Sequence, residues 1–155
     1  MILPQGGLAM EITSPEFQHN TDIPKKFTCQ GIDCSPTLEI KNVPASAKSL
    51  VLIVDDPDAS TGNWDHWIVY NIPPLTATIA EGSTPGLRCL NDFRRKEWGG
   101  PCPPSGRHRY FFKIYALDIL LSQLPDNAKK NDLLRAMDGH ILEKAQLIGL
   151  YQKVH

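Results

Sequence analysis

Three short segments of the sequence hold the side chains best suited to chemistry: DDPDAS, NWDHW and GRHRY. They supply carboxylates, two imidazoles, an indole and a phenol, from Asp56, Asp58, Trp64, His66, His108 and Tyr110. Imidazole N–H and phenol O–H groups donate hydrogen bonds to small anions. A carboxylate is tolerable there if Asp56 orients a histidine through its second ring nitrogen, or if the ligand also carries an ammonium group. These residue types predict a pocket for a small anion.

Each segment adjoins a predicted strand that would position it. Runs rich in β-branched and aromatic residues predict strands over Ser49–Asp56, Trp64–Pro73 and His108–Asp118. Side chains alternate between the two faces of a strand, so residues of interest that lie two positions apart share a face. If the three strands are neighbours, these side chains meet at one edge of a sheet.

The loop before the third strand, GGPCPPSG, is predicted to form one wall of the pocket. Its prolines have a fixed φ, and its glycines permit a ligand to approach the backbone closely. Arg109 has the opposite strand parity from His108. We therefore expect Arg109 to pair with Asp58 or Asp65 and not to touch a ligand.

The remaining pattern favours a mostly β fold with a C-terminal helical segment. Weaker strands are predicted near Glu11 and over residues 37–43. Residues 131–153 carry an apolar stripe at helical spacing, with Gly139 weakening or breaking the helix; the stripe comprises Leu134, Met137, Ile141, Ala145 and Ile148. Residues 1–155 are expected to form one domain, in which the helical segment closes one side of two packed antiparallel sheets.

Composition narrows the function classes. The formal net charge of −1 over 155 residues gives no reason to expect nucleic acid binding. The N-terminus lacks a signal peptide pattern and no apolar run is long enough to span a bilayer, so a cytoplasmic protein without stable membrane insertion is expected.

The cysteines do not match paired zinc motifs, and reduced thiols are expected in cytosol, with a Cys29–Cys34 disulfide as the alternative. The four cysteines are Cys29, Cys34, Cys89 and Cys102.

Four ordered motifs, DDPDAS, WDHWIVYNIP, GGPCPPSGRHRYFFKIYALD and AMDGHILEKAQLIGLYQK, resemble the phosphatidylethanolamine-binding protein family. The likeness is to its bacterial and archaeal branch, often labelled Raf kinase inhibitor-like, and runs from about Ile12 to Lys153. It implies a large central antiparallel sheet, a smaller second sheet and an anion pocket at one edge. It assigns ligand binding to Asp56, Trp64, His66, Gly100, Pro101, His108 and Tyr110, with Asp58 in a supporting role beside Arg109.

Trp98 departs from the family pattern, because bacterial relatives usually carry tyrosine there. Its side chain would make the pocket rim bulkier if it points inward.

The resemblance favours ligand binding over catalysis. We expect a small binding protein without a cofactor, holding phosphate or a phosphoethanolamine-like head group and acting on protein partners. One alternative is a hydrolase that uses the pocket histidines, alone or with a metal held by Asp56, His66 and His108, since two imidazoles and a carboxylate form a known metal set. Another is inhibition of a kinase pathway through protein contact, which the family label suggests.

Overall fold

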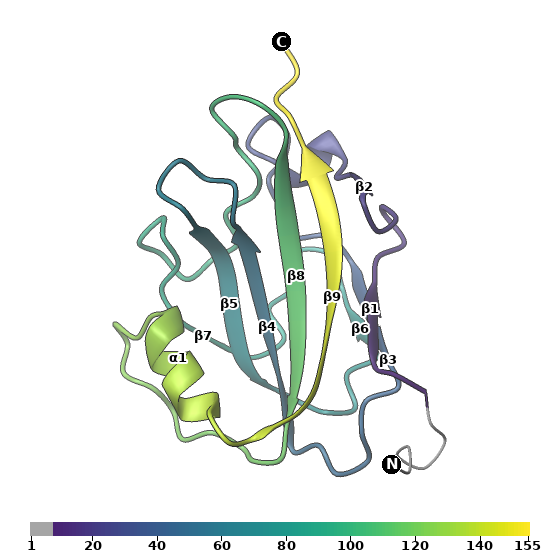
Figure 1. The fold of residues 1–155 in the computed structure, drawn as a ribbon, viewed down its shortest axis with the longest axis vertical. Coiled ribbons are helices and arrows are strands. Elements are labelled where there is room, and N and C mark those ends of the chain that lie inside the picture. The colour runs from purple at the N-terminus through teal and green to yellow at the C-terminus, as the bar shows by residue number, and fades with distance from the viewer. Residues whose placement is uncertain (1–7) are drawn as a thin grey trace.

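A six-stranded sheet forms the centre of the protein (Figure 1). The computed structural model describes residues 8–155. In spatial order the strands are β2 (Thr21–Asp22), β9 (Ile141–Tyr151), β8 (His108–Leu117), β4 (Ser49–Asp56), β5 (Trp64–Ile72) and β7 (Leu87–Arg88). The β2–β9 pair is parallel and the other pairs are antiparallel. The three strands predicted most strongly are therefore neighbours, with β4 in the middle.

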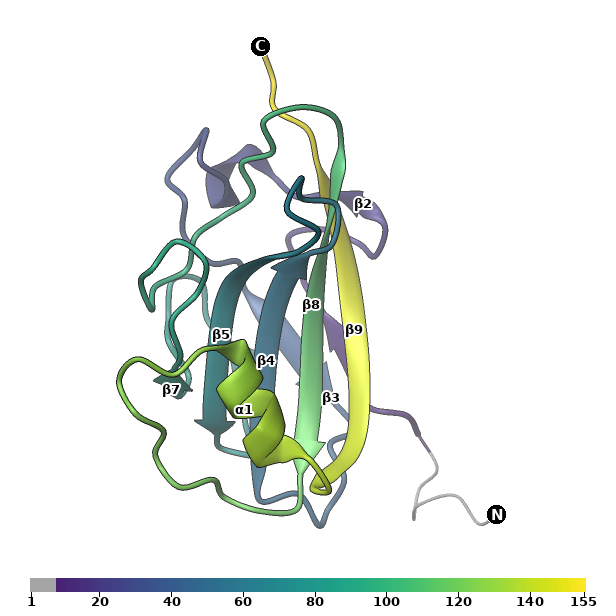
Figure 2. The same ribbon diagram turned by 60° about the vertical axis from the view of Figure 1, so that its left-hand side comes forward.

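A smaller sheet and one helix cover the two faces of the large sheet (Figures 1 and 2). The smaller sheet has the order β1 (Glu11–Thr13), β3 (Leu38–Lys41) and β6 (Thr78–Ile79), and the helix is α1 (Lys130–Met137). A short 3-10 turn, η1 (Lys25–Phe27), precedes the first cysteine. The predicted mostly β fold of two sheets with a C-terminal helical segment is confirmed.

Strand β4 is buried along its whole length because both of its faces are covered. Leu50, Leu52 and Val54 belong to the core cluster that includes Ile12 and Ile40 of the smaller sheet. The alternate residues Val51 and Ile53 belong to a second cluster, which contains Leu133 and Met137 of α1. Two faces that both need apolar side chains explain why this strand reads as a continuous apolar run.

The extended C-terminal helix was a wrong prediction beyond Gly139. Helix α1 ends at Met137, Gly139 adopts a positive φ of 81°, and β9 then pairs with β8 from Ile141 to Tyr151. Within β9 the buried positions, Leu147, Gly149 and Tyr151, alternate as in a strand. Pairing with a strand about thirty residues earlier in the chain outweighed local helical spacing.

The docking face of α1 also differs from the predicted stripe. Leu133 is fully buried against the sheet, whereas Leu134 is 38% exposed. Met137 is buried as predicted. The short helix is thus rotated so that Leu133 and Met137, four positions apart, make its contact with the sheet.

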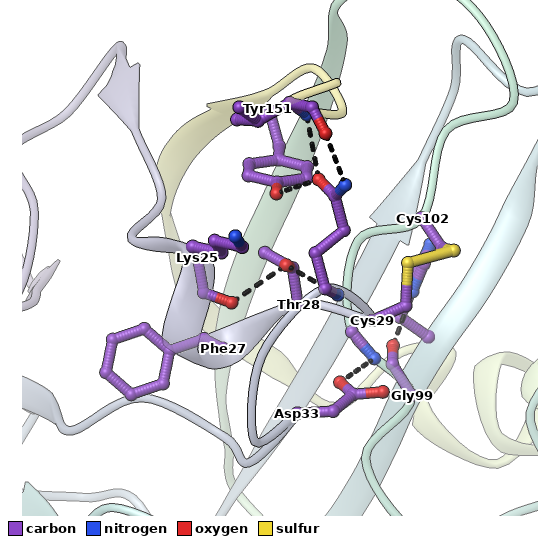
Figure 3. Close-up of a disulfide and its surroundings, with 12 residues drawn as sticks. Lys25, Phe27, Thr28, Cys29, Asp33, Gly99, Cys102 and Tyr151 are labelled. Atoms are coloured by element: carbon purple, nitrogen blue, oxygen red, sulfur yellow. Dashed lines mark hydrogen bonds between the residues drawn. A yellow bond between two sulfur atoms is a disulfide. The ribbon is translucent and has the colours of Figure 1, made fainter.

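The expectation of reduced thiols is wrong for two cysteines. Cys29 and Cys102 form a disulfide whose Cα atoms lie 5.4 Å apart, across a sequence separation of 73 residues (Figure 3). Cys34 and Cys89 are free, so the alternative pairing of Cys29 with Cys34 is also wrong. The bridge joins the segment after η1 to the proline-rich loop before β8. Within residues 8–155, no helix combines the length and apolar character needed to cross a membrane.

Candidate ligand-binding site

A cavity of about 240 Å³ lies at the edge of the large sheet where β4 ends and β5 and β8 begin. Because β5 and β8 are both antiparallel to β4, the end of β4 and the starts of its neighbours meet at the same edge. Asp56 is paired directly with Trp64 across β4 and β5. The cavity is lined by Asp56, Ala59, Ser60, Thr61, Trp64, His66, Phe93, Cys102, Pro103, Pro104, His108 and Tyr110.

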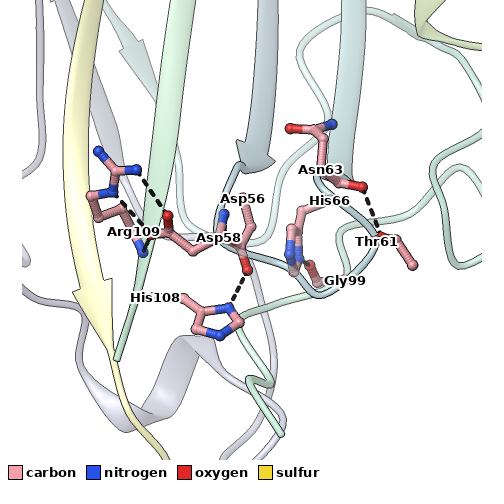
Figure 4. Close-up of polar contacts among 8 residues, drawn as sticks. All are labelled: Asp56, Asp58, Thr61, Asn63, His66, Gly99, His108 and Arg109. Carbon is pink, nitrogen blue, oxygen red and sulfur yellow. Dashed lines mark hydrogen bonds and ion pairs between the residues drawn. The ribbon is translucent and has the colours of Figure 1, made fainter. Parts of the chain in front are cut away.

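His108 is held by Asp56, which is the first of the two arrangements that make a carboxylate tolerable in an anion pocket. The distance from Nδ1 of His108 to Oδ2 of Asp56 is 2.6 Å, and both side chains are buried (Figure 4). A carboxylate only accepts hydrogen bonds, so Nδ1 carries the proton and Nε2 is the remaining polar atom of the ring. The other oxygen of Asp56, Oδ1, accepts a bond of 2.7 Å from the backbone N–H of Asp58. Both carboxylate oxygens therefore have protein donors.

His66 is fixed in a parallel way by a backbone carbonyl. Its Nδ1 lies 2.5 Å from the carbonyl oxygen of Gly99, which can only accept a hydrogen bond (Figure 4). Burial lowers the pKa of His66, although the Gly99 carbonyl and the charge of Asp56 oppose that effect. The imidazole is therefore neutral near pH 7, with a proton on Nδ1 and an acceptor lone pair on Nε2.

Aromatic rings surround the two histidines. The ring centroids of His66 and Tyr110 are 5.2 Å apart in an edge-to-face arrangement, and those of His108 and Tyr110 are 6.5 Å apart. Phe93 contacts both Trp64 and His66 edge-to-face. Burial and the charge of Asp56 raise the pKa of Tyr110, so its hydroxyl keeps its proton. The cavity thus combines apolar rings with the polar atoms of two imidazoles and a phenol.

Asp58 and Arg109 support the cavity from outside its lining. The guanidinium Nε and Nη2 of Arg109 donate to Asp58 at 2.9 and 2.8 Å (Figure 4). These hydrogen bonds lower the pKa of the Asp58 carboxyl. The predicted pairing of Arg109 is therefore with Asp58; Asp65 instead bonds Lys130, with 2.7 Å from Oδ1 to Nζ. This bidentate pair fixes the turn that carries the Asp58 N–H to Asp56.

Gly100 and Pro101 do not line the cavity. The backbone N–H of Gly100 donates to Oδ1 of Asp33 at 2.9 Å, and the carbonyl of Pro101 accepts from the N–H of Cys29 at 3.1 Å. A Cβ at position 100 would lie 2.3 Å from the backbone carbonyl oxygen of Phe27, so only glycine fits there without a shift of the backbone. These two residues anchor the loop, and the next residues, Cys102 to Pro104, form the lining.

Trp98 does not form the cavity rim. It is 8% exposed, packs edge-to-face on Trp67, and donates from Nε1 to the carbonyl of Phe27 at 3.3 Å. The condition for a bulkier rim, a Trp98 side chain that points into the cavity, is not met, because the ring belongs to the core between the sheets. Phe93 contributes an aromatic ring to the lining instead, and no sequence motif around it indicated this.

The donors proposed for a metal do not form a metal site. In residues 8–155 no group of three or more His, Cys, Asp or Glu side chains is arranged to hold a metal ion. Asp56 is instead bonded to His108 and to a backbone N–H. The arrangement of donors gives no support to the metal-assisted alternative.

The order and spacing of these residues match a known family over most of the chain. The sequence model described as phosphatidylethanolamine-binding protein matches residues 13–152. The chain belongs to this family. The family and the fold together support a small ligand-binding protein.

Relatives and solved structures agree over nearly full lengths. A UPF0098 protein of Chlamydia trachomatis is 46% identical over 150 residues, which cover 93% of this chain and 99% of that protein. A UPF0098 protein of Aquifex aeolicus is 44% identical and covers 96% and 91%.

Among solved structures, a phosphatidylethanolamine-binding protein homologue from Chlamydia trachomatis is similar with a TM-score of 0.91 and 46% identity, covering 94% of this chain and 99% of that one. YbcL of E. coli, described as a new member of the mammalian family, is similar with a TM-score of 0.87 and 26% identity, covering 95% and 100%.

Proposed function

We propose that the protein binds a small anion that carries a phosphate group, such as inorganic phosphate or phosphoethanolamine, in the cavity at the end of β4. The observation that carries the proposal is the matched fixation of two buried imidazoles. Nδ1 of His108 is committed to Asp56 and Nδ1 of His66 to the Gly99 carbonyl. The polar atoms that these rings can offer a ligand are therefore their Nε2 atoms. The carboxylate of Asp56 is neutralised in part by its own donors, which makes an anion beside it tolerable.

The protonation states narrow the class of anion. A neutral His66 presents an acceptor at Nε2, because its proton is on Nδ1. A fully deprotonated phosphate group would repel that lone pair, whereas a phosphate group that retains one P–O–H can donate to it. The Tyr110 hydroxyl supplies a donor for another oxygen, and Nε2 of His108 supplies one when that ring carries a proton on each nitrogen. Acidification adds a proton to the phosphate group and so populates the form that donates to Nε2 of His66; the affinity for a phosphate monoester should therefore rise as pH falls toward about 6, the second pKa of such a group.

Titration of the purified protein with inorganic phosphate, followed by calorimetry, tests the proposal. His66→Ala and His108→Ala should each weaken binding by about tenfold or more, because a hydrogen bond to a charged ligand contributes roughly 1.5–3 kcal/mol. His140→Ala is the matched control. Its Nδ1 also bonds a carboxylate, Oδ1 of Asp118 at 2.8 Å, but the pair is exposed and lies outside the cavity.

Undiminished phosphate binding in both cavity variants would contradict the proposal. Phosphoethanolamine compared with phosphate in the same series reports whether an ammonium group adds affinity. Contact with a protein partner such as a kinase, and a cytoplasmic location, stay predictions from the resemblance and from the N-terminal sequence.

A further inference from the structure

The disulfide joins two segments that already meet through hydrogen bonds. The Nε1 of Trp98 donates to the carbonyl of Phe27, Gly100 donates to Asp33, and Cys29 donates to Pro101. These bonds hold the loop from residue 98 to residue 101. None of these bonds involves a sulfur atom.

Beyond Pro101 the loop has few attachments. Cys102, Pro103 and Pro104 line the cavity, and residues 104–107 are exposed. In the described part of the chain, none of the hydrogen bonds involves residues 103–106. The backbone of Cys102 does contact the Tyr110 hydroxyl, which is itself a cavity group. The Cys29–Cys102 bridge is thus the covalent tie that holds this wall of the cavity against the segment after η1 (Figure 3).

The two cysteines differ in accessibility. Cys29 is exposed, whereas Cys102 is half-buried beside the cavity. An external thiolate therefore reaches Cys29 more readily than Cys102, and attack on Sγ of Cys29 releases Cys102 as the thiolate. Neither free cysteine is as exposed, since Cys34 is half-buried and Cys89 is buried.

We propose that the Cys29–Cys102 disulfide is a reversible redox control of the ligand cavity, reduced by a dithiol that attacks Cys29. The inference rests on the proposed function, because its effect is on the same cavity. One thiolate of the dithiol forms a bond to Sγ of Cys29 as the bond to Sγ of Cys102 breaks. The second thiolate then attacks the sulfur of the first and releases Cys29. The disulfide gains two electrons and two protons, and the dithiol becomes a disulfide.

Reduction should weaken ligand binding because the wall must then be ordered by the ligand. If phosphate must fix the backbone of about one residue when it binds to the reduced protein, its affinity should fall about tenfold. The loop before Pro101 should be unaffected, because its hydrogen bonds do not involve sulfur. The inference therefore predicts a change confined to residues 102–107 and to the cavity.

The test compares oxidised protein with protein reduced by dithiothreitol and then kept under the same buffer without oxygen. Phosphate affinity is measured by calorimetry, and amide hydrogen exchange is followed across residues 98–108. The variant Cys29→Ser removes the disulfide without a reductant. Cys34→Ser, which removes a thiol that is not part of the disulfide, is the control. We expect about tenfold weaker phosphate binding and faster exchange of the Cys102 amide, which contacts the Tyr110 hydroxyl, in the reduced protein and in Cys29→Ser. The bonded amides of Gly99 and Gly100 should exchange at unchanged rates.

Equal phosphate affinity in the two redox states would overturn the inference. If the oxidised protein binds no phosphate, the proposed function fails, and hydrogen exchange then decides the redox inference by itself. Unchanged exchange of the Cys102 amide on reduction would overturn it in that case. Far-UV circular dichroism of Cys29→Ser verifies that the sheets remain folded during these measurements.

Discussion

The disulfide gives the most quantitative stability prediction. Replacing both Cys29 and Cys102 by serine removes a covalent link across 73 residues. In the chain-entropy description, a loop of that length restricts the unfolded chain by about 15 cal/mol/K, which is about 4 kcal/mol at 25 °C. The double substitution should lower the free energy of unfolding by about that amount.

The expected change in melting temperature follows from the size of the chain. A protein of 155 residues has an unfolding entropy of about 0.33 kcal/mol/K near its midpoint. A loss of about 4 kcal/mol therefore corresponds to about 12 °C. Urea unfolding followed by tryptophan fluorescence measures the free energy, and calorimetry measures the midpoint. Cys34→Ser, which removes a free thiol, is the control and should cost less than about 1 kcal/mol.

A loss below about 1 kcal/mol in the double variant would refute this reasoning. It would mean that the unfolded chain already keeps the two segments together, so that the bridge removes little entropy. A much larger loss would mean that the serines disturb the folded state as well. Retained hydrogen exchange protection in β4 and β8 distinguishes the second case from simple loss of the link.

Three further predictions concern the core and the buried histidine. Burial lowers the pKa of His66, so as pH falls the unfolded chain takes up a proton at this residue before the folded chain does. The resulting contribution to the free energy of unfolding is present above about pH 6.5 and is lost as pH falls below it. Urea unfolding should therefore show a smaller decrease in that free energy between pH 7.5 and pH 5 for His66→Gln than for the native chain. Gly100→Ala should lower the free energy of unfolding by about 1–3 kcal/mol because its Cβ would overlap the backbone carbonyl of Phe27. Gly106→Asn, at a positive φ in open space, should lower it by less than about 1 kcal/mol, and equal losses in chemical unfolding would contradict the close approach at Gly100. Leu133→Ala should cost about 2–5 kcal/mol and Leu134→Ala less than about 1 kcal/mol by chemical unfolding, and the reverse order would place the wrong face of α1 on the sheet.

The main strands and the members of the cavity were predictable because both leave local signals. The apolar runs of β4, β5 and β8 are continuous or alternating. Residues that are costly to bury without a partner lie at the end of β4 and at the starts of β5 and β8. Asp56, His66, His108 and Tyr110 are brought together as predicted, since strand parity and an antiparallel neighbour fix their positions. Their role in ligand binding stays a prediction.

The contributions of loops were less predictable, because a loop side chain is placed by what it meets in three dimensions. Phe93 reaches the cavity although it lies in a turn without a binding motif. Gly100 and Pro101 were expected in the lining but hold the loop from behind, one residue before it begins. A shift of one residue along a loop changes the face that it presents, and no local periodicity specifies that shift.

The sequence by itself determined the mostly β fold, its three central strands and the chemistry gathered at their ends, because alternation and composition act over a few neighbouring residues. Only the tertiary structure decided the disulfide partner of Cys29 and the conformation of residues 141–151. Four cysteines allow several pairings, and the choice depends on η1 lying against the loop before β8. The last segment carries apolar residues compatible with either helix or strand. The open edge of β8, with Ile23 and Phe17 close to Gly149, selects the strand.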